Sequence, residues 1–332
     1  MRFVDSLNQY LDNFLKQNNK NYIIGEDIVD PYGGAFKVTK NLSTKFPQNV
    51  FSMPISESSI IGFATGLALQ KNKVIAEIMF GDFLALGADQ IINHLSKFSW
   101  MYQKEYDLNV TIRVPVGGYR GYGPTHSQSL ENLYFNCTNL HILSPSLFVD
   151  PGQLLLDSIN ELQKPKLFLE NKSLYSKKII TNNDERLDFL MFKNDKSIFP
   201  ITRISQNLDE FNDQIIITHG GFTSKLFEIQ KKLFLDHEID FSIISPSLIK
   251  PFPFKLIEDD IKNSKRIMIF EETSVHYGWS SEIAAQLYNM NKDIQIKRIG
   301  AKPYPIPAAR HLEEEVLPSD ELMYNSILSF FI

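Results

Sequence analysis

The chain has 332 residues, of which 43% are hydrophobic and 22% charged, and its formal net charge is −5 at pH 7. Because a single hydrophobic core seldom grows beyond ~250–300 residues, this length predicts two globular domains. The composition excludes disordered and fibrous proteins, and the lack of a long basic run argues against nucleic acid or an anionic membrane surface as the main partner.

The single cysteine and the amino-terminal residues indicate the compartment. Cys137 cannot form an intrachain disulfide, which is typical of a reducing cytoplasm. Residues 1–10 place Arg2, Asp5 and Asn8 among the apolar residues and so lack the core of a signal peptide, and no apolar run reaches the ~18 residues of a membrane span. We therefore expect a soluble cytoplasmic protein.

Short apolar runs alternate with stretches of helical periodicity, which is the pattern of parallel strands joined by crossover helices. The predicted strands of the first half are Tyr22–Gly25, Val74–Met79, Val110–Val114, His141–Leu143 and Lys166–Glu170. Those of the second half are Gln214–Thr218, Phe241–Ile244, Arg266–Glu271 and Ile294–Ile299. The alternation predicts an α/β fold of two doubly wound domains. The polar stretch between the two series of strands places their boundary, with domains at 1–190 and 206–332 and a linker at 191–205. Sites on such sheets lie beyond the carboxyl ends of the strands.

The first segment of chemical interest contains a predicted helix start. Pro54 disfavours helix in the residue before it, and Ser56 is a suitable N-cap, so a buried helix with Gly62 and Gly66 on one face is expected to follow. Glu57 then lies in the first helical turn. A carboxylate there either complements the helix dipole, worth ~0.3–1 kcal/mol, or takes part in chemistry.

A second segment leads from the strand at Val74–Met79 through a turn at Gly81-Asp82 into a helix. Phe83 is thereby placed at the carboxyl end of a strand, where its ring is either part of the core or available to stack on a ligand. Asp89, Gln90 and Asn93 lie on an otherwise apolar helix and, if buried, need polar partners, such as those of an interface.

The third segment, 116–131, contains four glycines and a proline ahead of a histidine. This composition predicts a shaped loop that presents His126 before a helix at Leu130–Asn136. Loops on a rigid scaffold often carry function, although a lone histidine is more often structural. The remaining histidines show no metal-ligand spacing, so no metal site is predicted within the chain.

Taken in order, these segments resemble the beta subunit of the decarboxylating first component of 2-oxoacid dehydrogenase complexes, in the transketolase-like superfamily of thiamine-diphosphate enzymes. The resemblance covers nearly the whole chain. Its motifs are Gly25-Glu26-Asp27, Gly33–Thr39, Pro54–Glu57, Asp82–Ile91, His126–Ser129, Leu169–Lys172 with Leu174-Tyr175, Phe270–Glu272 and Pro303–Pro307. It implies a transketolase-like pyrimidine-binding domain followed by a transketolase C-terminal domain.

The resemblance also implies roles for individual residues. Glu57 matches the carboxylate that hydrogen-bonds the aminopyrimidine ring of thiamine diphosphate and supports its proton transfer, and Phe83 matches the aromatic residue on which that ring packs. Ile55, two residues before Glu57, is expected among the cofactor-binding residues. His126 matches an active-site histidine near the reacting carbon, suited to proton transfer because its unperturbed pKa is near ~6.5.

Half of the cofactor site is expected on another polypeptide. Family members bind the diphosphate through Mg²⁺ with a Gly-Asp-Gly motif, which is absent here; Gly81-Asp82-Phe83 does not match it. The resemblance therefore implies an alpha subunit that carries the Mg²⁺ and diphosphate ligands, in a heterotetramer of two alpha and two beta subunits. The second domain is expected to support dimer contacts. Some members hold a structural potassium ion near the segment that matches Ser158–Glu161, but this segment departs from their pattern, so the sequence does not decide whether potassium is bound.

The reaction has two interpretations. In the first, a small 2-oxo acid is oxidatively decarboxylated and its acyl group passes to lipoamide on an acyltransferase partner. Pyruvate, branched-chain and acetoin-type substrates all remain open. In the second, suggested by departures from the family pattern at Tyr134–Leu140 and His276–Trp279, the protein is a two-subunit transketolase-like carboligase of specialised biosynthesis.

Overall fold

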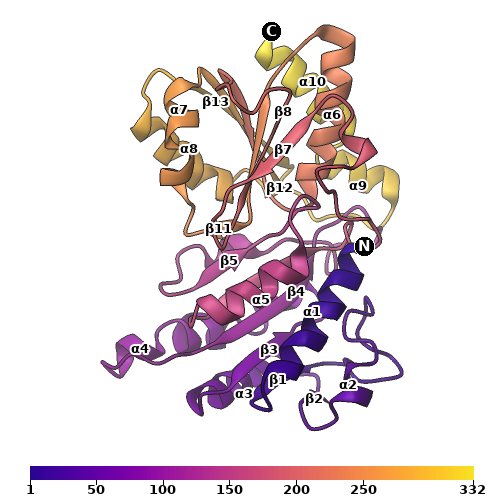
Figure 1. The fold of residues 1–332 in the computed structure, drawn as a ribbon, viewed down its shortest axis with the longest axis vertical. Coiled ribbons are helices and arrows are strands. Elements are labelled where there is room, and N and C mark those ends of the chain that lie inside the picture. Colours follow the sequence, from indigo (N-terminus) through magenta and orange to yellow (C-terminus); the bar gives the residue numbers. More distant parts are fainter.

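The computed structural model describes residues 1–332 and shows two α/β domains that lie end to end along the longest axis (Figure 1). The helices and strands of the first domain are α1 (Phe3–Gln17), β1 (Asn21–Gly25), α2 (Leu42–Lys45), β2 (Val50–Ser52), α3 (Glu57–Leu69), β3 (Lys73–Glu77), η1 (Gly81–Ala85), η2 (Gln90–Leu95), α4 (Phe98–Met101), β4 (Val110–Val116), η3 (Glu131–Tyr134), β5 (His141–Leu143), α5 (Pro151–Glu161), β6 (Lys166–Asn171) and η4 (Glu185–Leu187).

The second domain follows directly. Its elements are β7 (Met191–Asn194), β8 (Ile201–Ser205), β9 (Gln214–Ile217), α6 (Gly221–His237), β10 (Ser242–Pro246), β11 (Leu248–Lys250), η5 (Phe254–Ile257), α7 (Glu258–Asn263), β12 (Arg266–Ser274), α8 (Trp279–Met290), β13 (Gln295–Ala301), α9 (Arg310–Val316) and α10 (Asp320–Phe331). No helix combines the length and the apolar character that a membrane crossing needs.

Each predicted strand is present, and the core strands pair in parallel. The first sheet has seven strands in the order β11-β5-β6-β4-β3-β1-β2, and the second has six in the order β13-β12-β9-β10-β8-β7. In the first sheet Ile24 lies opposite Ala76, and Ala76 lies opposite Ile112. These strands are buried on both faces, as parallel strands covered by crossover helices are.

The interpretation of 191–205 as a linker is wrong, because this segment contains two strands of the second sheet. β7 pairs antiparallel with β8, and β8 pairs antiparallel with β10. β7 is an edge strand whose residues alternate between exposed and half-buried, so no continuous apolar run marks it in the sequence. The helix predicted at Leu130–Asn136 is also shorter than expected, and only the single 3₁₀ turn η3 forms there.

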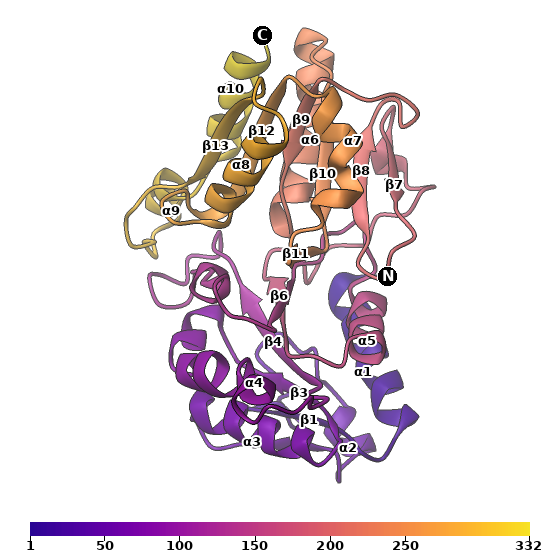
Figure 2. The ribbon, with the colours of Figure 1, turned by 90° about the vertical axis from the view of Figure 1, so that its left-hand side faces the viewer.

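Helices cover both faces of each sheet, and two apolar clusters extend across both domains. One cluster contains Phe14 of α1 and Phe227 of α6. The other contains Ile60 of α3, Ile261 of α7 and Leu287 of α8. Figure 2 shows α1 and α5 on one side of the first sheet and α3 on the other. Both domains are therefore doubly wound, and their cores are continuous.

Candidate active site

Loops at the carboxyl ends of the parallel strands of the first sheet carry the predicted site residues. Glu26 follows β1, Phe83 follows β3, His126 follows β4 and Lys172 follows β6. Glu57 follows β2, which pairs in parallel with β1. Because β6, β4, β3, β1 and β2 are successive neighbours, these loops meet at one edge of the sheet. This edge is where α/β sheets bind ligands.

Glu57 lies in the first turn of α3 and is only 5% exposed. The helix begins as predicted, with Ser56 as N-cap accepting from the backbone N–H of Ser59 at 3.4 Å. The neighbouring Glu26 is also buried. Burial raises the pKa of Glu26, and the negative charge of Glu57 raises it further. Oε1 of Glu26 has no hydrogen-bond partner in the chain. Two acidic groups with spare bonding capacity therefore lie at the start of α3.

The start of α3 is joined to η1, the short helix that carries Phe83. The hydroxyl of Ser58 donates to the carbonyl of Leu86 at 2.6 Å. At the turn from β3 into η1, a Cβ on Gly81 would lie 2.8 Å from a methyl group of Val116, so only glycine fits there. Glu57 and Phe83 are thus held on two elements that are bonded to each other.

Two phenylalanines and the predicted histidine form an aromatic cluster. The His126 ring lies edge-on to Phe80 at 4.7 Å and to Phe83 at 5.2 Å between ring centroids. All three residues are half-buried. Nδ1 of His126 lies 3.0 Å from the hydroxyl of Thr125. The structure therefore brings Phe83 and His126 together, and it adds Phe80, which the sequence reasoning missed although it lies next to the predicted turn.

Lys172 holds the main chain of the histidine. Its ammonium group donates to the carbonyl oxygen of His126 at 2.8 Å and lies 5.3 Å from the centre of the Phe80 ring. Burial lowers the pKa of Lys172 to about 8, while the nearby carboxylates of Glu272 and Asp82 oppose this shift. A buried cation is therefore placed directly behind the aromatic cluster.

A buried charge network below this edge was also missed. Arg113 donates to both carboxylate oxygens of Glu170 at 2.6 Å and to Glu77 at 2.7 Å, and the hydroxyl of Tyr175 donates to Glu170 at 2.7 Å. Arg113 is 1% exposed. The pairs tie β3, β4 and β6 together below the loops. In the sequence this network was indicated by a lone arginine inside an apolar strand, because a buried charge needs a partner of opposite charge.

Several predicted residues lie at the surface. Ile55 is 85% exposed, and the face of α3 that carries Gly66 is open, so α3 is not buried on all sides as predicted. Asp89 and Asn93 are exposed and hydrogen-bond each other at 2.8 Å. Together with Leu86, which is 61% exposed, these residues form a surface next to the start of α3.

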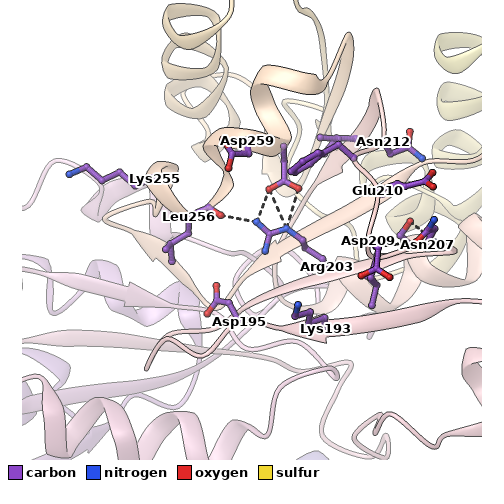
Figure 3. A pocket seen from close by; sticks show the side chains of 16 residues that line it. Lys193, Asp195, Arg203, Asn207, Asp209, Glu210, Asn212, Lys255, Leu256 and Asp259 are labelled. Atoms are coloured by element: carbon purple, nitrogen blue, oxygen red, sulfur yellow. Dashed lines mark hydrogen bonds and ion pairs between the residues drawn. The ribbon is translucent and has the colours of Figure 1, made fainter.

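The second domain contains a hollow of about 270 Å³ beside β7, β8 and the loop 207–212 (Figure 3). Arg203 lies in it and donates to Asp260 at 2.6 Å and to the carbonyl of Leu256 at 2.7 Å. None of the predicted site residues lines this hollow. Its main cation already has partners within the chain, so the hollow is not the candidate site.

Two protein families match the chain. The transketolase pyrimidine-binding domain matches residues 1–178, and the transketolase C-terminal domain matches residues 206–323. A split-gene transketolase, solved as an inactive beta4 tetramer, superposes with a TM-score of 0.73 at 18% identity and covers 100% of this chain and 98% of that one. At this identity the superposition shows a shared fold.

Relatives of similar length span almost the entire chain. The beta-2 subunit of mitochondrial 2-oxoisovalerate dehydrogenase from Arabidopsis thaliana is 28% identical, over 99% of this chain and 88% of the relative. The beta subunit of the pyruvate dehydrogenase E1 component from Cyanidium caldarium is 30% identical, over 96% and 94%. The beta subunit of acetoin:2,6-dichlorophenolindophenol oxidoreductase from Bacillus subtilis is 28% identical, over 98% and 95%. The chain therefore belongs to the transketolase family, among the beta subunits of 2-oxo acid dehydrogenases and related enzymes.

Proposed function

We propose that the chain is the beta subunit of a thiamine-diphosphate enzyme that decarboxylates a small 2-oxo acid and passes the acyl group to lipoamide. The observation that carries this proposal is the buried Glu57 in the first turn of α3, beside the unpartnered Glu26 and joined to the helix of Phe83. The relatives in this family support the reaction class. The single cysteine, Cys137, is buried and unpaired, which supports a reducing compartment such as the cytoplasm.

The residues present fit the pyrimidine half of the cofactor. Glu26 Oε1 is a buried acceptor that the chain itself leaves without a donor, and an aminopyrimidine offers such donors. Phe83 is half-buried at the same edge and offers an aromatic surface. We infer that Glu57, Phe83 and Ile55 hold the ring. When bound, the cofactor supplies a nucleophilic carbon and takes up the charge left by loss of CO₂.

The residues at this edge of the sheet then have specific tasks. Glu57, buried in the first turn of α3, holds a proton or a hydrogen bond at the ring nitrogen. Phe80 and Phe83 fix the imidazole of His126 edge-on and keep water from that side. His126 moves the proton that acyl transfer to a sulfur requires, on a loop at the mouth of the site.

The exposed surface beside α3 supports the proposal that a second subunit binds there. Ile55, Phe63 and Leu86 are 85%, 45% and 61% exposed, and they lie next to the proposed ring site. An apolar surface of this kind beside an incomplete site is typical of a protein interface. We propose that an alpha subunit covers it and supplies the Mg²⁺ and diphosphate ligands in a heterotetramer.

The first test concerns Glu57. In the assembled enzyme, Glu57→Gln should preserve assembly and slow exchange of the thiazolium proton by at least ~10²-fold, because an amide accepts a hydrogen bond but cannot take the proton. The exchange is followed by NMR in deuterated buffer. Glu185→Gln, at an exposed position away from this site, is the matched control. An unchanged exchange rate with Glu57→Gln would remove this residue from the mechanism.

The second test separates the dehydrogenase from the carboligase. His126→Ala should slow transfer to a lipoylated domain at least ~10²-fold more than decarboxylation measured with an artificial electron acceptor. Equal slowing of both steps would contradict the role of His126. If the unmodified assembly uses aldehyde acceptors and ignores the lipoylated domain, the carboligase function holds instead.

A further inference from the structure

The loop that carries His126 is held by carboxylates from the second domain. This histidine loop, residues 117–126, is the first part of the connection from β4 to η3. The backbone N–H of Gly118 donates to Glu272 of β12, and the N–H of Gly121 donates to Oε2 of Glu313 of α9 at 3.0 Å. Two successive points of the loop are therefore bonded to side chains that lie more than a hundred residues away in sequence.

A third contact lies between these two points. The hydroxyl of Tyr119 donates to the carbonyl of Pro318 at 2.8 Å, and the ammonium group of Lys225 lies 3.2 Å from the centre of the Tyr119 ring. Both Pro318 and Lys225 belong to the second domain. Contacts with the second domain therefore hold the first five residues of the loop.

The backbone of the loop needs such external support. Gly117, Gly121 and Gly123 have φ of 95°, 68° and 79°, and Tyr119 has φ of 62°. A bulky residue in this region is strained, and the strain persists only where surrounding contacts hold the conformation. The bonds at Gly118 and Gly121 flank Tyr119 and supply that constraint.

Both carboxylates are buried, which costs free energy unless they are hydrogen-bonded or paired. Glu313 is 1% exposed, and its Oε1 has no partner. Glu272 is 9% exposed and also accepts from Asn171 at 2.8 Å. Their negative charges also favour the protonated form of Lys172 and so raise its pKa against the effect of burial, and Lys172 donates to the carbonyl of His126. The carboxylates thus act on both ends of the histidine loop, directly at the glycines and through Lys172 at His126.

We propose that Glu272 and Glu313 are positioning residues, through which the second domain sets the place of His126 against Phe80 and Phe83. This inference rests on the proposed function of His126, and it assigns the second domain a task at the active site beyond dimer contacts. The variants that test it are Glu313→Ala and Glu272→Ala, with Glu313→Gln as the conservative version that keeps an acceptor. Glu314→Ala, on the exposed side of α9, is the matched control.

Hydrogen–deuterium exchange on the assembled enzyme tests the hydrogen bonds between the loop and the two carboxylates independently of catalysis. Peptides that cover 117–126 should exchange at least ~10-fold faster in Glu313→Ala and Glu272→Ala, because the freed N–H groups lose their acceptor. Glu313→Gln should restore most of the protection, and Glu314→Ala should change nothing. Unchanged exchange in both alanine variants would overturn the proposal.

Turnover then tests whether the carboxylates act through the histidine. Glu313→Ala should lower kcat by ~10–10²-fold, the order of effect of a misplaced catalytic group, and leave KM nearly unchanged. In a His126→Ala background the same substitution should have no further effect. An equal loss in both backgrounds would show a general structural defect and overturn the proposal. Failure of the proposed function is seen separately, as a lack of thiamine-diphosphate-dependent turnover in the unmodified assembly.

Discussion

At the scale of single residues, two buried cations of the first domain differ in how they are compensated. Arg113 is paired with two carboxylates. Lys166 is 0% exposed, and its ammonium group donates to Oδ1 of Asn109 at 2.8 Å, which is a neutral acceptor. Burial lowers the pKa of Lys166 to about 7, and the positive charge of Lys73 adds to this shift. The protonated form of Lys166 therefore lowers the stability of the folded chain.

This difference predicts a dependence of stability on pH. The pKa of Lys166 falls from 10.5 to about 7 on folding, so between these values the unfolded chain binds the extra proton and stability rises with pH. We expect the free energy of unfolding of Lys166→Met, relative to the natural chain, to fall by about 1 kcal/mol per pH unit between pH 7 and pH 9.

Urea unfolding of both chains at pH 7, 8 and 9 measures this difference. Lys164→Met is the control, because Lys164 is exposed two residues away. A difference that stays constant with pH would show that Lys166 is protonated throughout this range in the folded chain.

At the scale of elements, α3 combines a buried site residue with an open face. Ser59, Phe63 and Gly66 are exposed along one side of it. A Cβ placed on Gly66 meets no atom of this chain within 4 Å, although glycine weakens a helix interior by about 1 kcal/mol relative to alanine. Glycine at this position would let the backbone of a partner subunit approach α3 closely.

We therefore predict that substitutions of Gly66 affect folding and assembly differently. Gly66→Ala should raise the stability of the isolated chain by about 0.5–1 kcal/mol, since alanine favours helix and the site is open. Gly66→Trp should fold equally well but weaken binding of the partner subunit by at least ~10-fold. Gln9→Trp, on the exposed side of α1, is the control for bulk alone. Calorimetric titration with the partner subunit measures the affinity. If Gly66→Trp binds as tightly as the natural chain, the interface lies elsewhere.

At the scale of the whole molecule, the two domains share structure. β11 lies in the second half of the sequence yet pairs antiparallel with β5 of the first sheet, with Leu248 opposite Leu143. Lys250 of β11 donates to the carbonyl of Leu140 at 2.9 Å. One apolar cluster also runs from Phe3 in α1 to Phe331 in α10. Neither domain completes its core without the other.

This sharing predicts cooperative unfolding. Scanning calorimetry of the isolated chain should show one transition whose calorimetric and van't Hoff enthalpies agree, because separating the domains would expose the shared cluster. Leu248→Ala, which thins the β11 contact, should lower the midpoint by several degrees without splitting the peak. Two resolved transitions in the natural chain would contradict this view.

Local patterns in the sequence determined much of the fold and the start of the site. Buried parallel strands are continuous apolar runs, so β1, β3, β4 and β6 were readable one by one. Capping is equally local, and Ser56 marked the beginning of α3. The glycine-rich loop after β4 indicated His126, and the strand end at β3 indicated Phe83, although their roles stay predictions.

Only the tertiary structure decided the contacts between distant segments. β7 and β11 lie at the edges of their sheets, and their place depends on the strand they pair with and not on their own residues. The partners of Arg113 come from β3 and β6, and those of the histidine loop come from β12 and α9. The sequence shows that a buried charge needs a partner. It does not show which one, because the partner comes from a neighbouring strand or from the other domain, and only the folded chain brings these segments together.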